Sequence, residues 1–554
     1  MTLLSVEHLR IALPPGADRS HALYDLSLQV RSGECLCVVG ESGSGKSMLA
    51  KALLRQLPRP LSVQSGRLLF RGEDLAARSE AAMRELRGRH ISMVFQEPMS
   101  ALNPLLRVGE QIDETLRAHG VKSAGARRAR VVELLGYVGL PDPERLRLAY
   151  PFELSGGQRQ RVVIAMALAF DPALLIADEP TSALDVTTQA QILELLRRIQ
   201  QDKGMALLFI THDFAVVEAI ADRVLVLEKG QVVEQGSARQ VLREPQAAYT
   251  RQLLAAVSAQ PLAPRATVDG AVVLKAERLG KVFSRRTGWW SKHTTRALDA
   301  VGLQVREGET LGIVGESGSG KSTLGRCLVR LLRADSGQIE WLGQDVAGLS
   351  EARLRPLRSE VQMIFQDPFA SLNPRQTVGR IIMTGPLVQG RTRADAEQRA
   401  RALLELVGLP ATAFERYPHE FSGGQRQRIG IARALAVEPK VLIADECVSA
   451  LDALIQVQIL ELLESLQRRL KLSIIFITHD LRVAARLCDR IAVMQDGRVV
   501  EQGDTATLFA DARHPYTRTL LHCGGRLAGD SALSSAATSE SFIAGTPAPT
   551  QGCV

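Results

Sequence analysis

Two copies of one glycine-rich segment have the composition and spacing of a phosphate-binding loop. The segment GESGSGKS occupies residues 40–47 and returns letter for letter at 315–322. In such a loop the glycines let backbone amides surround phosphate oxygens, the lysine reaches the β- and γ-phosphates, and the final hydroxyl is offered to Mg²⁺. The candidate phosphate-binding residues are Gly40, Glu41, Ser42, Gly43, Ser44, Gly45, Lys46 and Ser47, and Gly315, Glu316, Ser317, Gly318, Ser319, Gly320, Lys321 and Ser322.

Two adjacent acids follow an apolar run in each half of the sequence. LLIADE ends in Asp178 and Glu179, and VLIADE ends in Asp445 and Glu446. Carboxylates at the end of a buried strand meet the ligand in open α/β sheets. We expect Asp178 and Asp445 to hold Mg²⁺, and Glu179 and Glu446 to orient and polarise an attacking water.

The elements that must position these groups read as two α/β units. Apolar, β-rich runs at 34–40 and 309–315 lead into the glycine-rich loops, and helical patterns at 46–57 and 321–332 follow them. Further apolar runs at 173–178, 206–211, 441–445 and 473–478 predict strands buried on both faces of a parallel sheet. Amphipathic patterns at 126–140 and 396–409 predict a helical subdomain in each half.

The length of the chain also requires more than one domain. The 554 residues exceed the roughly 250 to 300 that one hydrophobic core holds. The repeat and the Pro-, Ala- and Gly-containing stretch between its copies predict a first domain at 1–257, a linker at 258–270 and a second domain at 271–523. A Ser-, Ala- and Gly-rich tail at 524–554 is expected to be disordered.

Composition narrows the class of protein further. We find no apolar run of the roughly 18 residues needed to span a bilayer and no leader-like start, so a cytosolic chain is expected. The net charge of +8 comes from scattered Arg and Lys, which favours a solvated basic surface over nucleic-acid binding. Seven cysteines without metal-ligand spacing indicate reduced, buried thiols.

The segments LSGGQRQR (154–161) and FSGGQRQR (421–428) resemble the signature motif of the ATP-binding cassette family, and the resemblance covers nearly the whole chain. It implies two tandem P-loop ATPase domains, each with a RecA-like parallel-sheet core, a helical subdomain and an antiparallel β part. It also implies that the halves form an intramolecular head-to-tail dimer. Ser155 and Gly157 would then contact the ATP held by Lys321, and Ser422 and Gly424 would contact the ATP held by Lys46.

The resemblance extends to further site residues. Gln96 and Gln366 match the glutamine that links Mg²⁺ and the attacking water to the transmembrane partner, and His212 and His479, each in a T-H-D segment, match the switch histidine. Asp185 and Asp452, at the ends of the two SALD segments, resemble the D-loop aspartate that communicates across the interface.

Two positions depart from the symmetric pattern. Phe283 fits the aromatic residue that stacks on adenine, whereas the matching position in the first half is Leu13, which points to weaker nucleotide binding there. Cys447 and Val448 replace Pro180 and Thr181 after the second catalytic acid. Because both acids are present, two competent ATPase sites are expected.

The segments EPMSALNP after Gln96, DPFASLNP after Gln366, HPYT at 514–517 and AAYT at 247–250 resemble the peptide and nickel importer branch of the family. This implies an ATPase subunit at the cytoplasmic side of the inner membrane that drives uptake of dipeptides, oligopeptides or glutathione. Its partners would be two integral-membrane permease subunits and a periplasmic or extracellular binding protein. Some members carry a cysteine-rich extension that binds an iron-sulfur cluster, and none is expected here because Cys523 and Cys553 are isolated.

Two alternatives stay open at the level of sequence. A soluble twin-cassette ATPase acting on ribosomes or DNA shares the phosphate motifs, although the short and mostly uncharged linker argues against it. The insert SRRTGWWSKHTT places Trp289 and Trp290 among basic residues, which fits either contact with lipid headgroups or, as we favour, a hairpin loop packing on its own domain.

Overall fold

The fold is seen in a computed structural model that describes residues 1–14, 19–96, 101–182, 184–257, 268–286, 292–449 and 451–524. We call the part up to residue 257 the first half and the part from residue 268 the second half. The proposed linker is described only from residue 268. Trp289, Trp290, Cys553 and the tail from residue 525 lie outside the described residues.

Each half contains a six-stranded sheet that is parallel except at one edge, as the apolar runs predict. In the first half the order is β10-β9-β3-β8-β7-β6, with β10 antiparallel to β9. The strands are β3 (Cys35–Val39), β6 (Ile91–Val94), β7 (Leu174–Asp178), β8 (Ala206–Thr211), β9 (Arg223–Glu228) and β10 (Gln231–Ser237).

The second half repeats this arrangement in the order β16-β17-β18-β13-β19-β20. Its strands are β13 (Thr310–Val314), β16 (Val361–Ile364), β17 (Val441–Asp445), β18 (Ser473–Thr478), β19 (Arg490–Gln495) and β20 (Arg498–Asp504). The parallel sheets predicted from the buried runs are therefore confirmed in both halves.

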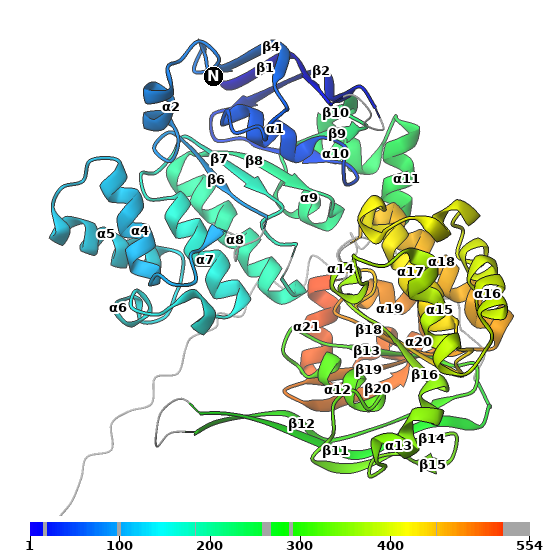
Figure 1. Cartoon of the computed structure of the whole chain (residues 1–554). Helices are drawn as coiled ribbons and strands as arrows, with labels where there is room; N and C mark the ends of the chain where they lie inside the picture. Colours follow the sequence, from blue (N-terminus) through cyan, green and yellow to red (C-terminus); the bar gives the residue numbers. More distant parts are fainter. Residues whose placement is uncertain are drawn as a thin grey trace, which may run out of the picture.

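An antiparallel sheet packs against each parallel sheet. The first has the order β2-β1-β4-β5 and the second β12-β11-β14-β15. Their strands are β1 (Thr2–Ala12), β2 (His21–Arg31), β4 (Val63–Phe70), β5 (Glu73–Asp74), β11 (Val272–Arg286), β12 (Lys292–Arg306), β14 (Ser336–Trp341) and β15 (Gln344–Asp345). In Figure 1 β11 and β12 extend well beyond the body of the second half.

The helices form the predicted subdomain and cover the parallel sheet. The subdomain helices are α4 (Val108–Ala118), α5 (Ala124–Tyr137), α6 (Pro143–Leu146) and α7 (Gly156–Ala167) in the first half, and α15 (Val378–Val388), α16 (Arg393–Leu406) and α17 (Gly423–Leu435) in the second. Further helices are α2 (Glu80–Leu86), α8 (Val186–Lys203), α9 (Phe214–Ile220), α10 (Ala238–Arg243), α13 (Glu351–Leu354), α14 (Pro368–Ser371), α18 (Ala453–Leu470), α19 (Leu481–Leu487) and α20 (Thr505–Ala510).

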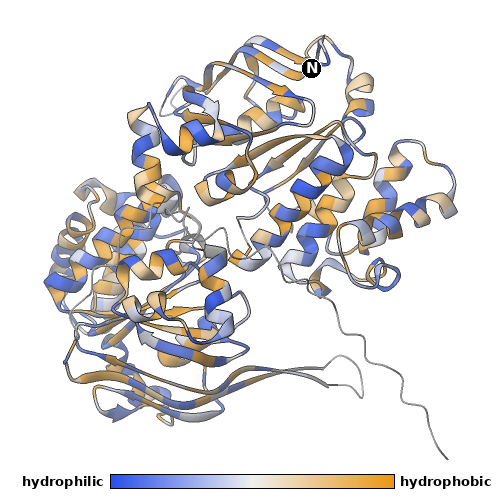
Figure 2. Ribbon diagram, turned by 180° about the vertical axis from the view of Figure 1, so that it is seen from behind, coloured by the Kyte–Doolittle hydropathy of each residue, from blue (hydrophilic) through white to orange (hydrophobic). Residues whose placement is uncertain are grey.

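The central sheet separates two hydrophobic cores in each half. Along β3, Leu36 and Val38 pack with the antiparallel sheet, whereas Cys35, Cys37 and Val39 pack with the helical subdomain. This alternation is the period of two of a strand, and both faces are apolar because both are covered. Figure 2 shows the hydrophobic residues concentrated in the sheets and on the inner faces of the helices. The described cysteines Cys35, Cys37, Cys327, Cys447 and Cys488 are buried free thiols, as predicted.

The helices that follow the glycine-rich loops are shorter than their sequence pattern predicts. They are α1 (Lys46–Leu53) and α12 (Lys321–Leu328). Soon after them, Arg55 and Arg330 adopt left-handed backbone angles, with φ of 52° and 56°. A residue in this region cannot continue a right-handed helix, so the apolar pattern runs on past the helix end.

The halves touch through one C-terminal helix from each. Helix α11 (Ala248–Val257) of the first half lies against α18, and α21 (Pro515–Gly524) of the second half lies against α8 (Figure 1). Leu454 at the start of α18 packs against the core of the first half. No helix among the described residues is long and apolar enough to cross a membrane.

A buried ion pair ties the start of the central strand to its neighbour in each half. The Glu309 side chain accepts hydrogen bonds from Arg490 Nη1 (2.8 Å) and from the Arg306 backbone amide (2.7 Å) and is only 1% exposed. Glu34 and Arg223 form the matching pair at 3.0 Å. Removal of one member of such a pair leaves an uncompensated buried charge.

We therefore expect Glu309→Ala to destabilise the second half by about 3 kcal/mol, a fall in Tm of roughly 6 to 12 °C. Thermal unfolding followed by circular dichroism measures this. Glu351→Ala, which breaks an exposed pair with Arg358, is the control and should shift Tm by little. Equal effects of the two variants would contradict the argument.

Candidate functional site

The two glycine-rich loops, here called the first P-loop (residues 40–47) and the second P-loop (residues 315–322), join the central strand to the following helix. Lys46 is buried, and its Nζ donates to the carbonyls of Gly40 (2.7 Å) and Glu41 (2.8 Å). Lys321 makes the same two bonds in the second half, both at 2.7 Å. Burial lowers the pKa of both lysines, and nearby carboxylates only partly offset this effect.

Glycine is required at the first position of each P-loop. A Cβ on Gly40 would lie 2.1 Å from the Leu227 carbonyl oxygen, and a Cβ on Gly315 would lie 2.2 Å from that of Met494. Because these distances are far below contact, the loop follows its path against the neighbouring chain only without a side chain there.

The predicted Mg²⁺ ligands are brought together beside each P-loop. Ser47 Oγ donates to Asp178 Oδ1 at 3.1 Å, and Ser322 Oγ donates to Asp445 Oδ1 at 3.0 Å. Burial raises the pKa of Asp178 and of Asp445, although the serine hydrogen bond opposes this. A buried carboxylate next to a hydroxyl is a hard-oxygen pair whose charge a divalent cation would stabilise. The described residues contain no cluster of three or more His, Cys, Asp or Glu that would hold a metal alone.

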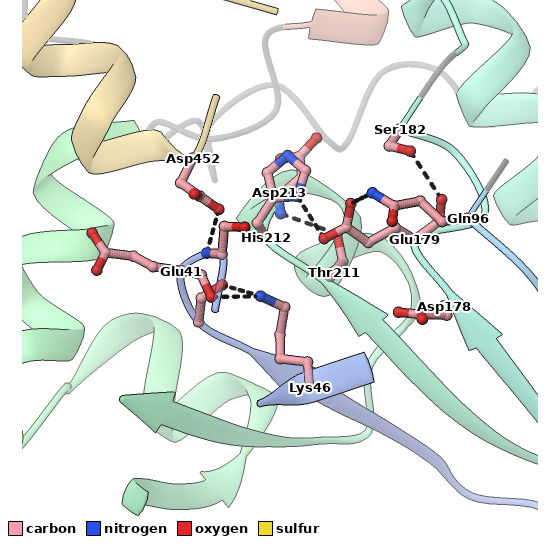
Figure 3. A network of polar contacts seen from close by, with 12 residues as sticks. Glu41, Lys46, Gln96, Asp178, Glu179, Ser182, Thr211, His212, Asp213 and Asp452 are labelled. Carbon is pink, nitrogen blue, oxygen red and sulfur yellow. Dashed lines mark hydrogen bonds and ion pairs between the residues drawn. The ribbon is translucent and has the colours of Figure 1, made fainter. Parts of the chain in front are cut away.

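In each half, the glutamate that follows the proposed Mg²⁺-binding aspartate faces a glutamine and a histidine. Figure 3 shows the first site. Gln96 Nε2 donates to Glu179 Oε2 at 2.8 Å, and His212 Nδ1 lies 3.1 Å from Glu179 Oε1. In the second half, Gln366 Nε2 donates to Glu446 Oε2 at 2.6 Å, while His479 Nδ1 is 3.7 Å from Glu446 Oε1. The three residue types predicted to act at each water site, glutamate, glutamine and histidine, therefore meet at one end of the parallel sheet.

The backbone turns sharply at these glutamates. Glu179 and Glu446 have left-handed φ angles of 46° and 44°, which cost a non-glycine residue on the order of 1 kcal/mol or more. Their amides donate to the carbonyls of Ile210 and Ile477, both at 2.9 Å, which holds the turn. Each glutamate therefore leaves the strand that carries its neighbouring aspartate and reaches a different set of partners.

The charges of the glutamate and the histidine support each other. Burial raises the pKa of Glu179, but the hydrogen bond and charge of His212, together with Lys46 and Gln96, lower it on balance. Burial likewise lowers the pKa of His212, but the hydrogen bond and charge of Glu179, together with the charges of Asp452 and Asp213, raise it on balance. The same balance holds for Glu446 and His479. The imidazole in each site thus retains a proton to a higher pH than a free histidine.

The serine of each signature segment starts a helix. Ser155 caps α7, where its Oγ accepts from the Gln158 amide at 3.3 Å and its own amide donates to Gln158 Oε1 at 3.0 Å. Ser422 caps α17 in the same way. The second glycines of the two segments, Gly157 and Gly424, are packed so closely that a Cβ would lie 2.5 Å from Thr188 and 2.4 Å from Ile455.

The structure also brings each P-loop against the other half. Asp452 accepts a hydrogen bond from the Ser42 amide at 2.7 Å (Figure 3), and the Thr187 hydroxyl is hydrogen-bonded to the Glu316 carboxylate. The sequence predicted a cross-interface role for both D-loop aspartates. Of these two aspartates, only Asp452 makes such a hydrogen bond among the described residues. Asp185 instead caps its own helix by accepting from the Thr188 amide and hydroxyl, and it shares the Thr187 hydroxyl with Glu316.

The physical reason for this difference is a change of residues. Thr187 and Thr188 of the first half are replaced by Leu454 and Ile455 in the second, which have no hydroxyl to offer. Asp452 is therefore free of local side-chain caps and reaches across the interface. The replacement of the two threonines is visible in the sequence, whereas the acceptor that each hydroxyl reaches is not.

Phe283 and Leu13, the residues proposed to contact adenine, lie in different surroundings. Phe283 on β11 is 45% exposed and pairs with Thr295, two residues from the Ala297 carbonyl that lies against Gly320. Leu13 is partly buried and packs against the antiparallel-sheet core. Phe283 is therefore an exposed ring on the strand paired with β12, and β12 contacts the second P-loop through Ala297. The first half has Leu13, which is not aromatic, at the matching position.

Comparison with known proteins gives consistent matches. The sequence profile described as ABC transporter matches residues 23–182 and 298–449, and that described as oligopeptide/dipeptide transporter, C-terminal region, matches 500–554. The chain is 48% identical over 526 residues to the peptidoglycan transport ATP-binding protein YejF of Agrobacterium fabrum, covering 94% of this chain and 96% of that protein.

A second relative is the glutathione import ATP-binding protein GsiA of Shigella dysenteriae serotype 1. It is 46% identical over 553 residues, covering 94% of this chain and 89% of that protein. Among solved structures, a dimeric ATP-binding cassette in a post-hydrolysis state bound to ADP and Pi matches with a TM-score of 0.38 and 29% identity, covering 42% of this chain and 98% of that one.

The glutamate–histidine pairing leads to a pH prediction. We expect His212 to titrate above 6.5, and we expect Glu179→Gln to lower its pKa because the variant removes the negative partner that outweighs burial. Carbon-13 labelling of the histidines and NMR titration of the full chain measures this. His479, which faces Glu446, is the internal control and should keep its midpoint. An unchanged His212 midpoint would show that Glu179 does not hold its proton.

The pKa shifts of His212 and Glu179 also determine how the stability of the fold changes with pH. The raised pKa of His212 stabilises the fold below pH 6.5, and this contribution is lost as the pH rises through the folded-state pKa. The lowered pKa of Glu179 stabilises the fold above pH 4.5, and this contribution is lost as the pH falls through its own folded-state pKa.

Proposed function

The chain belongs to the ABC transporter family and is an ATPase, and we propose that it hydrolyses ATP at two composite sites to drive uptake of short peptides through separate permease subunits. The single observation that carries this proposal is the duplicated set of P-loop lysine, Mg²⁺ ligands and glutamate–histidine pair, each set touched by the other half. The domain boundaries we propose are those expected from the sequence, with a first cassette at 1–257 and a second at 271–523.

We propose that each nucleotide is bound between the halves. Helices α8 and α18, here called the D-loop helices, begin directly after Asp185 and Asp452. The Asp452–Ser42 and Thr187–Glu316 hydrogen bonds link each P-loop to the start of the other half's D-loop helix. Each D-loop helix also packs on the second glycine of the signature segment in its own half. Ser422 and Gly424 would therefore complete the first ATP site, around Lys46, and Ser155 and Gly157 the second ATP site, around Lys321.

Each residue of a site would have a separate role in ATP hydrolysis. The lysine leaves the P-loop carbonyls for the β- and γ-phosphates, and the loop amides bind the remaining phosphate oxygens. Glu179 and Glu446, kept ionised by their partners, orient and polarise the attacking water. His212 and His479 donate to the γ-phosphate. The helix N-termini capped by Ser155 and Ser422 favour its negative charge.

Mg²⁺ would be held by Ser47 and Asp178 in the first site and by Ser322 and Asp445 in the second. Gln96 and Gln366 are hydrogen-bonded to the glutamates that follow these aspartates. When bound, the ion neutralises charge on the β- and γ-phosphates. The raised pKa of both aspartates fits this role, since each buried carboxylate lacks enough positive charge around it in the protein alone.

The proposed permease contact lies on the helical subdomain of the first half. A hollow of about 410 Å³ is lined by residues of α4, of the segment before it, and of α7. The segment before α4 exposes Leu105 and is held by Gln111, whose side chain bonds the Asn103 amide and carbonyl. Leu105 and Leu106 are adjacent exposed leucines, and Leu106 lines the hollow. This apolar rim supports a contact with a membrane subunit, which would place the chain at the cytoplasmic side of the inner membrane.

Short peptides are the substrate class that best fits the comparisons. The two relatives are named for transport of peptidoglycan and import of glutathione, and the C-terminal region matches a profile of oligopeptide and dipeptide transporters. We propose that a separate substrate-binding protein delivers the peptide. The same matches favour the importer over the soluble twin-cassette alternative.

Removal of the two catalytic acids should stop turnover without preventing ATP binding. The Glu179→Gln, Glu446→Gln double variant should lose ATPase activity by a factor of about 100 or more and still bind ATP, because only the water-polarising groups are removed. Phosphate release and equilibrium ATP binding are the measurements. Glu194→Gln, on the exposed side of α8, is the matched control and should hydrolyse ATP normally. Normal turnover in the double variant would overturn the assignment.

The proposed permease partners can be identified by purification of the complex. Affinity purification of the tagged chain from detergent-solubilised host membranes should recover two multi-span permease subunits, identified by mass spectrometry. A tagged soluble protein of similar size is the control. Recovery of ribosomal proteins or nucleic acid without membrane subunits would contradict the importer and favour the soluble alternative.

A further inference from the structure

Two tyrosines outside the nucleotide-binding motifs hold the P-loops. The Glu316 amide donates to Tyr516 Oη at 2.9 Å, and the Glu41 amide donates to Tyr249 Oη at 3.3 Å. The carbonyls of the same two glutamates accept from the P-loop lysines. Each P-loop therefore has its second residue fixed on one side by a lysine that must move to bind phosphate, and on the other by a tyrosine hydroxyl.

The helix that carries Tyr516 is firmly anchored. Glu501 on β20 accepts hydrogen bonds from the amides of Arg513 (2.8 Å) and His514 (3.1 Å), immediately before α21. His514 Nδ1 accepts from the Tyr516 amide at 3.2 Å, and Thr517 is fully buried. The HPYT segment is thus a local device that points one tyrosine at the P-loop.

The first half has a weaker form of this device. Glu234 accepts from the amides of Gln246 (2.8 Å) and Ala247 (3.1 Å) before α11, as Glu501 does before α21. Ala247 replaces His514, so the side chain that bonds the tyrosine amide in the second half is missing. The longer Tyr249 bond agrees with this looser arrangement.

These two helices also rest on the opposite half. Helix α21 lies against α8, which begins directly after Asp185, and α11 lies against α18, which begins directly after Asp452. Thr187 in the first turn of α8 bonds the Glu316 carboxylate. Glu316 is therefore held by its amide from α21 and by its carboxylate from α8.

We propose that Tyr516 and Tyr249 are positioning residues for the ATP sites, and that their hydroxyls keep the P-loops in the shape that accepts ATP when the lysine turns to the phosphates. This inference rests on the ATP binding proposed above. It assigns a role to the HPYT segment, and it makes the second P-loop the more tightly held. Burial raises the pKa of Tyr516 to about 12, so the hydroxyl stays neutral at physiological pH.

The test measures ATP affinity at one site at a time in the full-length chain. Lys46→Ala leaves the second site as the binding site, and Lys321→Ala leaves the first. Equilibrium binding of radiolabelled ATP with Mg²⁺ gives the Kd. In the Lys46→Ala background, Tyr516→Phe should raise the Kd about fivefold, the effect of losing one hydrogen bond. In the Lys321→Ala background it should leave the Kd unchanged.

Two further variants separate positioning from general damage. Tyr249→Phe should weaken only the first site, and by less than Tyr516→Phe weakens the second. His514→Ala keeps the tyrosine but loosens its helix, so it should weaken the second site by about twofold. Tyr137→Phe is the matched control, since its hydroxyl donates to Asp202 on the helical side of the first half and should change neither Kd.

The possible outcomes are distinct. Site-specific weakening with an unchanged Tm supports the positioning role. A Kd for Tyr516→Phe equal to that of its Lys46→Ala parent, or equal weakening of both sites, overturns it while leaving the proposed function intact. Absence of ATP binding in the wild-type chain would instead overturn the proposed function, and the inference with it.

Discussion

The structure depends on close contact between each P-loop and the D-loop helix of the other half. A P-loop alone presents unsatisfied amides and a buried lysine, and it is held in place by groups that come from several elements. In this chain some of those groups belong to the opposite half: Asp452 for the Ser42 amide and Thr187 for the Glu316 carboxylate. Neither half therefore supplies all the contacts of its own loop in this structure.

The two halves have the same fold but satisfy this requirement differently. In the first half, Asp185 is occupied by Thr187 and Thr188, and the contact across the interface falls to a hydroxyl. In the second half, Leu454 and Ile455 leave Asp452 free to cross directly. The tyrosine bonds and the single aromatic at Phe283 add to this inequality. A fused chain can keep such differences because each site always has the same partner.

Much of this was predictable from the sequence, and the reasons are physical. Apolar runs such as LLIAD predict buried parallel strands because both faces are covered, and Asp178 follows from its place at the strand end. The helices α1 and α12 end early because two arginines turn the backbone, which hydrophobic periodicity does not reveal. The tyrosine contacts were missed because they join residues about 200 positions apart, and HPYT was read only as a family marker. The unequal D-loops depend on which of two available acceptors a hydroxyl reaches, and spacing alone does not decide this.

Composite ATP sites within one chain can be tested by a crystal structure of the Glu179→Gln, Glu446→Gln variant with ATP and Mg²⁺. We expect two ATP molecules per chain, one touching Lys46 and Ser422 and the other touching Lys321 and Ser155. Nucleotides contacted by one half alone, or sites completed by a second copy of the chain, would contradict this arrangement.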